Sequence, residues 1–283
     1  MPPRRLRLDA ELVRRRLAPS RERAAQLIAE RRVKVAGIVA TKPATGVTTD
    51  VAIVVLEGEH GPDYVSRGAH KLAGALAVFA PLGLEVAGRR VLDAGASTGG
   101  FTDVLLRAGA AQVVAVDVGY GQLHWSLQQD PRVDVRDRTN VRALTVEEIG
   151  GPVDLVVGDL SFISLVLVLD ALLGVMAPDG DLALMVKPQF EVGKDRVGKG
   201  GVVRDPELRA EAVLAVAHAA ADRGWGAHAV TVSPLPGPSG NVEFFLWLRR
   251  GPAAVDDESI ADVVRRGTSG PEETSGPDEK VGP

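Results

Sequence analysis

The fold is decided by the stretch Arg90-Val-Leu-Asp-Ala-Gly-Ala-Ser-Thr-Gly-Gly-Phe101, an apolar run that ends in an aspartate and continues through a glycine-rich turn into an apolar helix. In doubly wound α/β sheets, ligands bind beyond the carboxyl ends of the strands, where glycines let the backbone come close to them. The glycines are spaced Gly-x-x-x-Gly-Gly, which matches neither a dinucleotide fingerprint nor a triphosphate P-loop. The stretch by itself fits a ligand-binding turn or a plain tight turn in which an acid pairs with a backbone amide.

From about residue 85 onward, short apolar runs alternate with helical patterns, which predicts βαβ units and a parallel sheet. Seven runs have the length and composition of strands. They cover residues 90–93, 112–117, 133–135, 153–159, 181–187, 227–232 and 242–248. The expected fold class is therefore α/β, with a seven-stranded sheet in the region 85–250.

Acidic residues stand at the predicted carboxyl ends of four successive strands: Asp93, Asp117, Asp137 and Asp159. Each could be a helix N-cap, the commoner role of an aspartate that follows a strand. Together they outline a site for a nucleoside-type cofactor, in which Asp117 accepts two vicinal ribose hydroxyls. Because the loop contains no basic residue for a phosphate, a sulfonium cofactor with ribose, adenine and an amino-acid moiety fits better than NAD. The cofactor-binding candidates are Asp93, Gly95, Ala96, Ser97, Gly99, Gly100, Phe101, Asp117, Asp137 and Asp159.

A second set of charged residues, the candidate catalytic group, consists of Lys71, Asp159, Lys187 and Glu243. Lys187 and Glu243 interrupt runs that otherwise have the pattern of buried strands, where a charge is costly unless it belongs to a site. The alternative is two ordinary surface pairs of a lysine with an acid.

The first 50 residues form a basic module, with 12 Lys and Arg against 5 Asp and Glu, a net charge of +7. Apolar spacing predicts helices over 8–17 and 21–31, with Ser20 as N-cap of the second, and strands over 33–35 and 51–56. A basic module attached to a mildly acidic body is typical of a protein that grips a polyanion with one part. The candidate polyanion-binding residues, which the resemblance described below makes candidates for RNA binding, are Arg4, Arg5, Arg7, Arg14, Ser20, Arg21, Arg23, Gln26, Arg31, Lys34 and Lys42. We expect about half of the arginines to be ordinary solvated surface.

The predicted domains are residues 1–60, a linker and lead-in helix over 61–84 that carries Lys71, the α/β domain over 85–250, and a flexible acidic tail over 251–283. The chain has no cysteine and only scattered histidines, so we expect no disulfide and no metal site. The amino terminus lacks the apolar core of a signal peptide, which makes the cytoplasm the expected location. Residues 160–177 approach the length of a membrane span, but Asp170 at their centre favours a buried amphipathic helix.

The chain resembles the TlyA family of the FtsJ-type ribose 2'-O-methyltransferases from about residue 4 to residue 250. The motifs that carry the resemblance are Ser66-Arg-Gly-Ala-His-Lys71, the glycine turn 93–101, Val118-Gly-Tyr-Gly-Gln122, Asp159-Leu-Ser-Phe-Ile-Ser164, Val186-Lys-Pro-Gln-Phe-Glu191 and Pro234-Leu-Pro-Gly-Pro-Ser-Gly-Asn241. The first segment resembles the RNA-binding domain named after ribosomal protein S-four.

The resemblance implies a Rossmann-like class I methyltransferase fold and methylation of a cytidine ribose in small- and large-subunit ribosomal RNA, with S-adenosylmethionine as cofactor and ribosomal RNA or ribosomal subunits as partner. It also implies that Lys187 is the general base. A lysine accepts a proton only in its neutral form, which is rare at neutral pH, so the alternative is that the lysines orient the hydroxyl and stabilise its developing charge. Two other functions stay open: a non-catalytic RNA-binding factor for ribosome assembly, and a membrane-active protein of the kind that the family's historical haemolysin label suggests.

Overall fold

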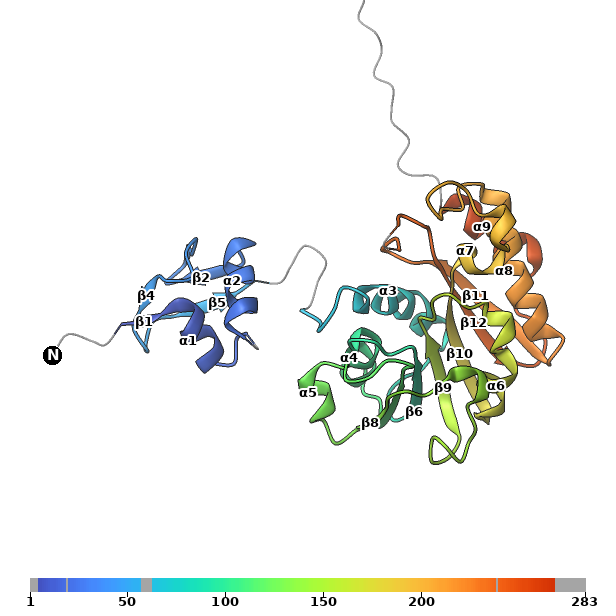
Figure 1. Cartoon of the computed structure of the whole chain (residues 1–283), viewed down its shortest axis with the longest axis horizontal. Helices are drawn as coiled ribbons and strands as arrows, with labels where there is room; N and C mark the ends of the chain where they lie inside the picture. The colour runs from blue at the N-terminus through green and yellow to red at the C-terminus, as the bar shows by residue number, and fades with distance from the viewer. Residues whose placement is uncertain (1–4, 19, 57–62, 238, 268–283) are drawn as a thin grey trace, which may run out of the picture. The chain divides into compact units, whose positions relative to one another are not determined.

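The computed structural model describes residues 5–18, 20–56, 63–237 and 239–267 and divides the chain into two compact units, residues 1–63 and 64–283. The smaller unit has one apolar core, and the larger unit has two, one on each face of its sheet. Figure 1 shows the elements of both units.

The smaller unit packs two helices on short antiparallel strands. Its elements are β1 (Leu6–Arg7), α1 (Leu8–Arg14), α2 (Arg21–Ala29), β2 (Val33–Val35), β3 (Ile38–Val39), β4 (Gly46–Val47) and β5 (Ile53–Val55). β2 lies between β3 and β5, and β1 pairs with β4. Ser20 accepts a hydrogen bond from the Arg23 amide at 3.1 Å and so caps α2 as predicted. α1 ends at Arg14, short of Leu17, because Arg16 adopts a left-handed conformation with φ of 59°.

The larger unit is built on a seven-stranded sheet in the order β11-β12-β10-β9-β6-β7-β8. The strands are β6 (Arg90–Ala94), β7 (Gln112–Val116), β8 (Val133–Arg136), β9 (Val153–Gly158), β10 (Met176–Val186), β11 (Trp225–Val232) and β12 (Phe244–Arg250). All seven predicted strands are present. The expected all-parallel sheet is wrong in one respect: β12 runs antiparallel to both β10 and β11. The chain starts β12 at the end of the sheet where β11 finishes, because the described residues between these two strands contain no crossover helix.

Helices cover both faces of this sheet (Figure 1). On one face lie α3 (Ala69–Phe79), α4 (Gly100–Arg107) and α5 (Trp125–Gln128); on the other lie α6 (Leu169–Gly174), α8 (Pro206–Ala221) and α9 (Asp257–Arg266). Both faces of the sheet need a cover of helices because successive side chains along each strand point to opposite faces and are apolar on both. In β6, for example, Val91 packs with the first group of helices and Leu92 with the second.

Short elements complete the connections: η1 (Ala80–Leu82), η2 (Val141–Ala143), η3 (Leu165–Leu167), α7 (Pro188–Glu191) and η4 (Lys194–Arg196). The single helix predicted over 160–177 is wrong, because this segment divides into a loop, η3, α6 and the start of β10. Asp170 is solvent-exposed and pairs with Arg223. Among the residues that the structure describes, no helix has the length and apolar character needed to cross a membrane.

The flexible tail predicted from residue 251 is also wrong for its first part. Asp256 accepts a hydrogen bond from the Ser259 amide and caps α9, whose buried Ile260, Ala261 and Val264 join the core beneath α8. Three apolar residues at helical spacing are enough for a helix once a neighbouring apolar face is available to receive them. The rest of the predicted tail, residues 268–283, lies outside the described residues.

Candidate active site

The strand-end acids lie at one edge of the sheet. β6 pairs in parallel with both β7 and β9, and β7 pairs in parallel with β8, so the residues that follow these four strands lie at the same edge. Asp93 is the next-to-last residue of β6. Asp117, Asp137 and Asp159 directly follow β7, β8 and β9. We call this edge the carboxyl edge of the sheet.

Two of these acids hold the loops of the edge in place. Asp117 accepts hydrogen bonds from the Ser97 amide at 2.8 Å and the Gly119 amide at 2.7 Å, and Asp137 accepts one from the Gly121 amide at 2.9 Å. Gly95 has a φ of +87°, and an added Cβ there would lie 2.9 Å from the carbonyl oxygen of Asp159. The turn therefore requires glycine at this position both for its backbone angle and for its close approach to the loop after β9.

Asp93 is fully buried, and no lysine or arginine of the described residues pairs with it. Thr102 Oγ1 donates to one of its oxygens at 2.7 Å, while the other oxygen has no hydrogen-bond partner among the described residues. The pKa of Asp93 is raised to about 7, chiefly by burial and in part by the nearby charges of Asp159 and Asp117, although the hydrogen bond from Thr102 acts in the opposite direction. Asp117 and Asp159 are thus close enough to Asp93 to affect its pKa, and the carboxylate of Asp117, which no lysine or arginine pairs with among the described residues, is suited to a positively charged ligand.

Several predicted cofactor residues are not open to a ligand in this structure. Ala96, Gly99, Gly100 and Phe101 are buried, and the Phe101 ring packs 5.9 Å from that of Phe245. A Cβ at Gly100 would lie 2.8 Å from the amide nitrogen of Ala69, at the start of α3. Gly100 thus allows α4 to pack closely against the helix that carries Lys71, while Ser97 is exposed at the turn.

The four candidate catalytic residues form two short ion pairs. Lys187 Nζ lies 2.5 Å from Asp159 Oδ1 and donates to Ser161 Oγ at 2.8 Å. Lys71 Nζ donates to Glu243 Oε2 at 2.5 Å. Within the described part of the chain, no hydrogen bond or ion pair joins one pair to the other.

These pairs are not the surface pairs of the alternative interpretation. The side chain of Glu243 is 1% exposed, that of Lys187 is 7% exposed and that of Lys71 is 10% exposed. Antiparallel pairing of Val186 with Phe244 brings Lys187 and Glu243, the residues next to them, to neighbouring strand ends. Buried charges at this edge are expensive unless they serve a site, so the structure supports a functional role.

Four residues at this edge were missed as site candidates. Ser161 contacts Lys187, and Glu191 accepts from Ser164 Oγ at 2.5 Å and from the Leu165 amide at 2.8 Å, which fastens the loop after β9 to α7. Burial raises the pKa of Glu191.

Phe162 is 91% exposed with a φ of 64°, and its ring lies 5.3 Å from that of Phe190. Asn241 is buried and binds two backbone groups. For Ser161 and Phe162 the available signal was a polar residue and an aromatic soon after an apolar strand.

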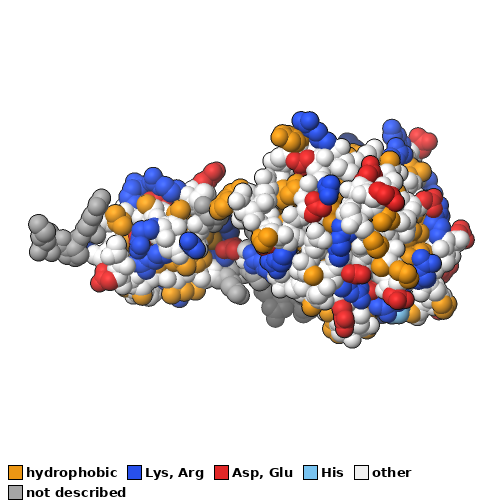
Figure 2. Space-filling model, turned by 90° about the horizontal axis from the view of Figure 1, so that it is seen from below, with side chains coloured by type: hydrophobic (Ala, Val, Ile, Leu, Met, Phe, Trp, Pro, Cys, Tyr) orange, Lys and Arg blue, Asp and Glu red, His pale blue; other side chains and the backbone are white. Residues whose placement is uncertain are grey.

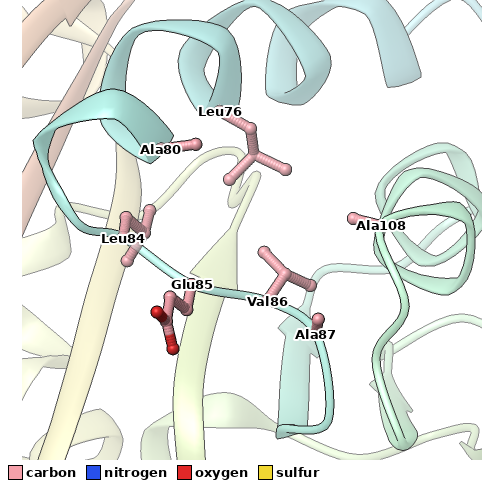
Figure 3. Close-up of a pocket in the computed structure, with 7 residues that line it drawn as sticks. All are labelled: Leu76, Ala80, Leu84, Glu85, Val86, Ala87 and Ala108. Carbon is pink, nitrogen blue, oxygen red and sulfur yellow. The ribbon is translucent and has the colours of Figure 1, made fainter.

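An apolar pocket of the larger unit lies elsewhere (Figure 3). It is lined by Leu76, Ala80, Leu84, Glu85, Val86, Ala87 and Ala108. Residues 84–87 lead into the amino end of β6, so this pocket is at the end of the sheet opposite to the charged residues. The candidate active site is therefore the group of charged residues at the carboxyl edge and not this pocket.

The smaller unit carries the basic surface. Figure 2 shows Lys and Arg side chains gathered on one face of it, whereas charges of both signs are interspersed on the same view of the larger unit. Several of the predicted RNA-binding arginines already pair with acids: Arg7 and Arg21 with Asp9, Arg14 with Glu11, and Arg23 with Glu30 and Asp63.

Other predicted RNA-binding residues of this unit have no ion pair. Arg5, Arg31, Lys34 and Lys42 form none with any described residue, and neither does Arg16, which the prediction left out. Gln26 is exposed, Ser20 is used as a helix cap, and Arg4 lies outside the described residues.

Comparison with known proteins agrees with this arrangement. Residues 64–250 match the FtsJ-like methyltransferase model, and residues 6–53 match the S4 domain model. The chain is 60% identical over 268 residues to the 16S/23S rRNA (cytidine-2'-O)-methyltransferase TlyA of Mycobacterium tuberculosis, covering 94% of this chain and 98% of that protein. It is 36% identical over 185 residues to the 23S rRNA (cytidine-2'-O)-methyltransferase TlyA of Campylobacter jejuni, covering 65% and 70%. A solved structure from Streptococcus thermophilus, described as a hemolysin, is 36% identical with a TM-score of 0.70 and covers 93% of this chain and 96% of that one.

The fold and its charged edge thus define the class: an FtsJ-like methyltransferase domain joined to an S4 domain. Identity of 60% to the Mycobacterium tuberculosis protein, over nearly the whole length of both proteins, narrows the class to one family. The chain belongs to the TlyA family.

Proposed function

We propose that this protein is an S-adenosylmethionine-dependent methyltransferase that modifies the ribose 2'-hydroxyl of cytidine in 16S and 23S ribosomal RNA. The observation that carries the proposal is the pair of buried lysine–carboxylate contacts at the carboxyl edge, in a chain 60% identical to a relative with this activity. Methyl transfer to a hydroxyl needs a group that manages one proton and groups that hold the oxygen in place. Two lysines and two carboxylates provide these.

The cofactor site is the exposed part of the glycine turn, with Ser97 and the residues that follow Asp117. When bound, S-adenosylmethionine supplies a methyl group on a positively charged sulfur. The carboxyl groups near the turn suit such a ligand, and the turn offers no basic residue to the phosphates of a dinucleotide. Asp93 acts from beneath the turn, because it is fully buried and bonded to Thr102.

In this proposal Lys187 takes the proton of the 2'-hydroxyl when its amine is neutral, since the charged amine that pairs with Asp159 can donate a hydrogen bond to the ribose oxygen but cannot accept its proton. Asp159 and Ser161 hold its amine in place at 2.5 and 2.8 Å. Lys71, fixed by Glu243, stabilises negative charge as it develops on the ribose oxygen. The exposed ring of Phe162 beside this group offers a face on which a base of single-stranded RNA can stack.

Lys187→Ala is the direct test, with Lys187→Arg to separate the roles. We expect both variants to bind cofactor as the wild type does in calorimetry and to lose about 10²- to 10⁴-fold in the single-turnover rate on unmethylated ribosomal subunits. Arginine keeps the charge but does not accept a proton at neutral pH. A near wild-type rate for Lys187→Arg would replace the base by a positioning role, and a near wild-type rate for Lys187→Ala would remove the residue from the mechanism.

The S4 domain holds the ribosomal RNA in this proposal, and ribosomal RNA as substrate places the reaction in the cytoplasm. The cations without an ion pair are the ones most available to phosphates, because they need not first leave a carboxylate. Contacts of this kind position the RNA and do not read its sequence.

Arg31→Ala combined with Lys42→Ala in the full chain tests this assignment. We expect the log–log salt dependence of binding to ribosomal RNA to fall by about 1.4 to 1.8 for two lost phosphate contacts. Cofactor affinity should not change. An unaltered salt dependence would exclude these two residues from the RNA contact.

A further inference from the structure

A long connection joins β10 to α8. It runs from Lys187 to Asp205 and contains only α7 and η4. Connections of this length inside a compact domain are uncommon and are usually functional. Its second part, residues 193–204, is called the 193–204 loop below.

The 193–204 loop is a basic island in an acidic unit. It contains the exposed cations Lys194, Arg196, Lys199 and Arg204 against the single acid Asp195, a net charge of +3, whereas residues 51–250 together carry −6. Arg196 pairs with Glu211, and Arg204 donates to the carbonyl oxygen of Lys199 at 3.3 Å. The ammonium groups of Lys194 and Lys199 bond to no described residue. These two lysines therefore offer uncompensated positive charge to solvent.

The same loop is held firmly by buried groups. Asn241, 3% exposed, accepts from the Val203 amide at 3.0 Å through Oδ1 and donates to the carbonyl oxygen of Gly201 at 2.8 Å through Nδ2. Arg209 Nε donates to the carbonyl oxygen of Val203 at 2.8 Å. A bridge between Gly198 and Val202 closes the tip of the loop. An ordered loop keeps its charges in one place, so less entropy is lost when they bind.

Its attachments place the loop beside the catalytic group. It begins six residues after Lys187, and Asn241, which fastens it, is two residues before Glu243. An RNA strand that presents a ribose to these two residues has its neighbouring phosphates close to the loop.

We propose that the 193–204 loop binds the phosphodiester backbone of the RNA next to the modified nucleotide, with Lys194 and Lys199 as the phosphate contacts. The proposal rests on the proposed function and extends RNA binding from the S4 domain to the methyltransferase unit. Lysine ammonium groups bind phosphates as point charges and carry no sequence preference. The loop therefore adds affinity near the reacting ribose without taking part in the chemistry.

The test is the full-length variant Lys194→Ala with Lys199→Ala, compared with the wild type on unmethylated ribosomal subunits. We expect binding weaker by about tenfold and a salt dependence lower by about 1.4 to 1.8 in log–log slope. The single-turnover rate at saturating subunits and the cofactor affinity should stay within twofold of wild type. Reversal of both charges in Lys194→Glu with Lys199→Glu should weaken binding further.

The matched control is Arg132→Ala with Arg223→Ala, which removes two positive charges just before the amino ends of β8 and β11, at the opposite edge of the sheet. Equal affinity and salt slope for the lysine variant and this control would overturn the proposal. A wild-type chain that binds subunits but transfers no methyl group would overturn the proposed function instead, and the binding comparison would still decide the role of the loop.

Discussion

The buried carboxylates Asp9 and Glu11 of the smaller unit and the buried carboxylate Asp93 of the larger unit differ in their charged neighbours and in the direction of their pKa shifts. In the S4 domain, Asp9 and Glu11 are buried, and each lies between two arginines. Hydrogen bonds from Arg14 lower the pKa of Glu11 to about 2, and those from Arg7 lower the pKa of Asp9 well below its usual range. At the carboxyl edge of the larger unit, Asp93 is buried without a cation, and burial raises its pKa to about 7.

The difference is not one between the two domains, nor one between the two ends of the sheet, because Glu243, buried at the carboxyl edge, is paired with Lys71. Asp181, at the other end of the larger unit's sheet, is also buried, and although burial opposes it, hydrogen bonds from Arg249, Arg89 and Trp247 lower its pKa. These buried carboxylates are thus supplied with cations from their own surroundings. Asp93, beneath the glycine turn, has no cation among the described residues, and groups with such unbalanced surroundings cluster at functional sites.

The largest effect in this comparison is expected from breaking the buried pair of Lys71 and Glu243. Lys71→Met leaves the carboxylate of Glu243 buried without a partner, which should lower the unfolding free energy by about 3 to 5 kcal/mol. Adding Glu243→Gln removes that charge and should restore part of the loss. Urea unfolding followed by tryptophan fluorescence measures both. The single variant Glu243→Gln completes the set. If the double variant loses as much unfolding free energy as Lys71→Met and Glu243→Gln lose together, the unpaired charge of Glu243 is not the reason why losing Lys71 is costly.

A smaller effect is expected from the titration of Asp93. Since its pKa is higher in the folded chain than in the unfolded chain, the stability it contributes is complete below about pH 4 and is lost as the pH rises to about 7. Between pH 5 and pH 8, Asp93→Asn should remove roughly 2 to 3 kcal/mol of pH dependence from the unfolding free energy of the larger unit. Urea unfolding at several pH values tests this. A slope in the variant equal to that of the wild type would mean that Asp93 does not titrate in this range.

The smallest effect is expected in the S4 domain, from Glu11→Gln. The variant keeps the shape of the side chain but loses its charged hydrogen bonds to Arg14 and Arg15, worth about 1 to 3 kcal/mol. Its opposite pH dependence sharpens the contrast with Asp93: the stability from Glu11 is complete above about pH 4.5 and is lost as the pH falls to about 2.

Hydrogen exchange measured by mass spectrometry over residues 5–35 follows this unit directly, which is useful because residues 1–63 contain no tryptophan or tyrosine. The control is Glu22→Gln, an exposed glutamate in the first turn of α2. If the backbone amides of residues 5–35 are equally protected from exchange in Glu11→Gln and in Glu22→Gln, the loss of the buried charge of Glu11 costs no more stability than the loss of an exposed charge.

The sequence by itself determined the features that depend on short-range pattern. The seven strands follow from apolar runs, the cap of α2 from Ser20, and the gathering of Asp93, Asp117, Asp137 and Asp159 at one edge of the sheet from their positions at or next to the ends of successive strands. Lys187 and Glu243 could be singled out because a charge inside an apolar run is already anomalous at the level of sequence. The basic character of the first 50 residues is likewise a matter of composition.

Only the tertiary structure decided which residues meet. Lys71 and Glu243 are 172 positions apart, and no local pattern specifies that they pair with each other while Lys187 pairs with Asp159. The antiparallel direction of β12, the helix α9 and the burial of Phe101 depend on packing surfaces that distant segments supply. The arginines of the S4 domain divide into paired and unpaired groups for the same reason: charge is a property of the residue, but its compensation is a property of its neighbours in space.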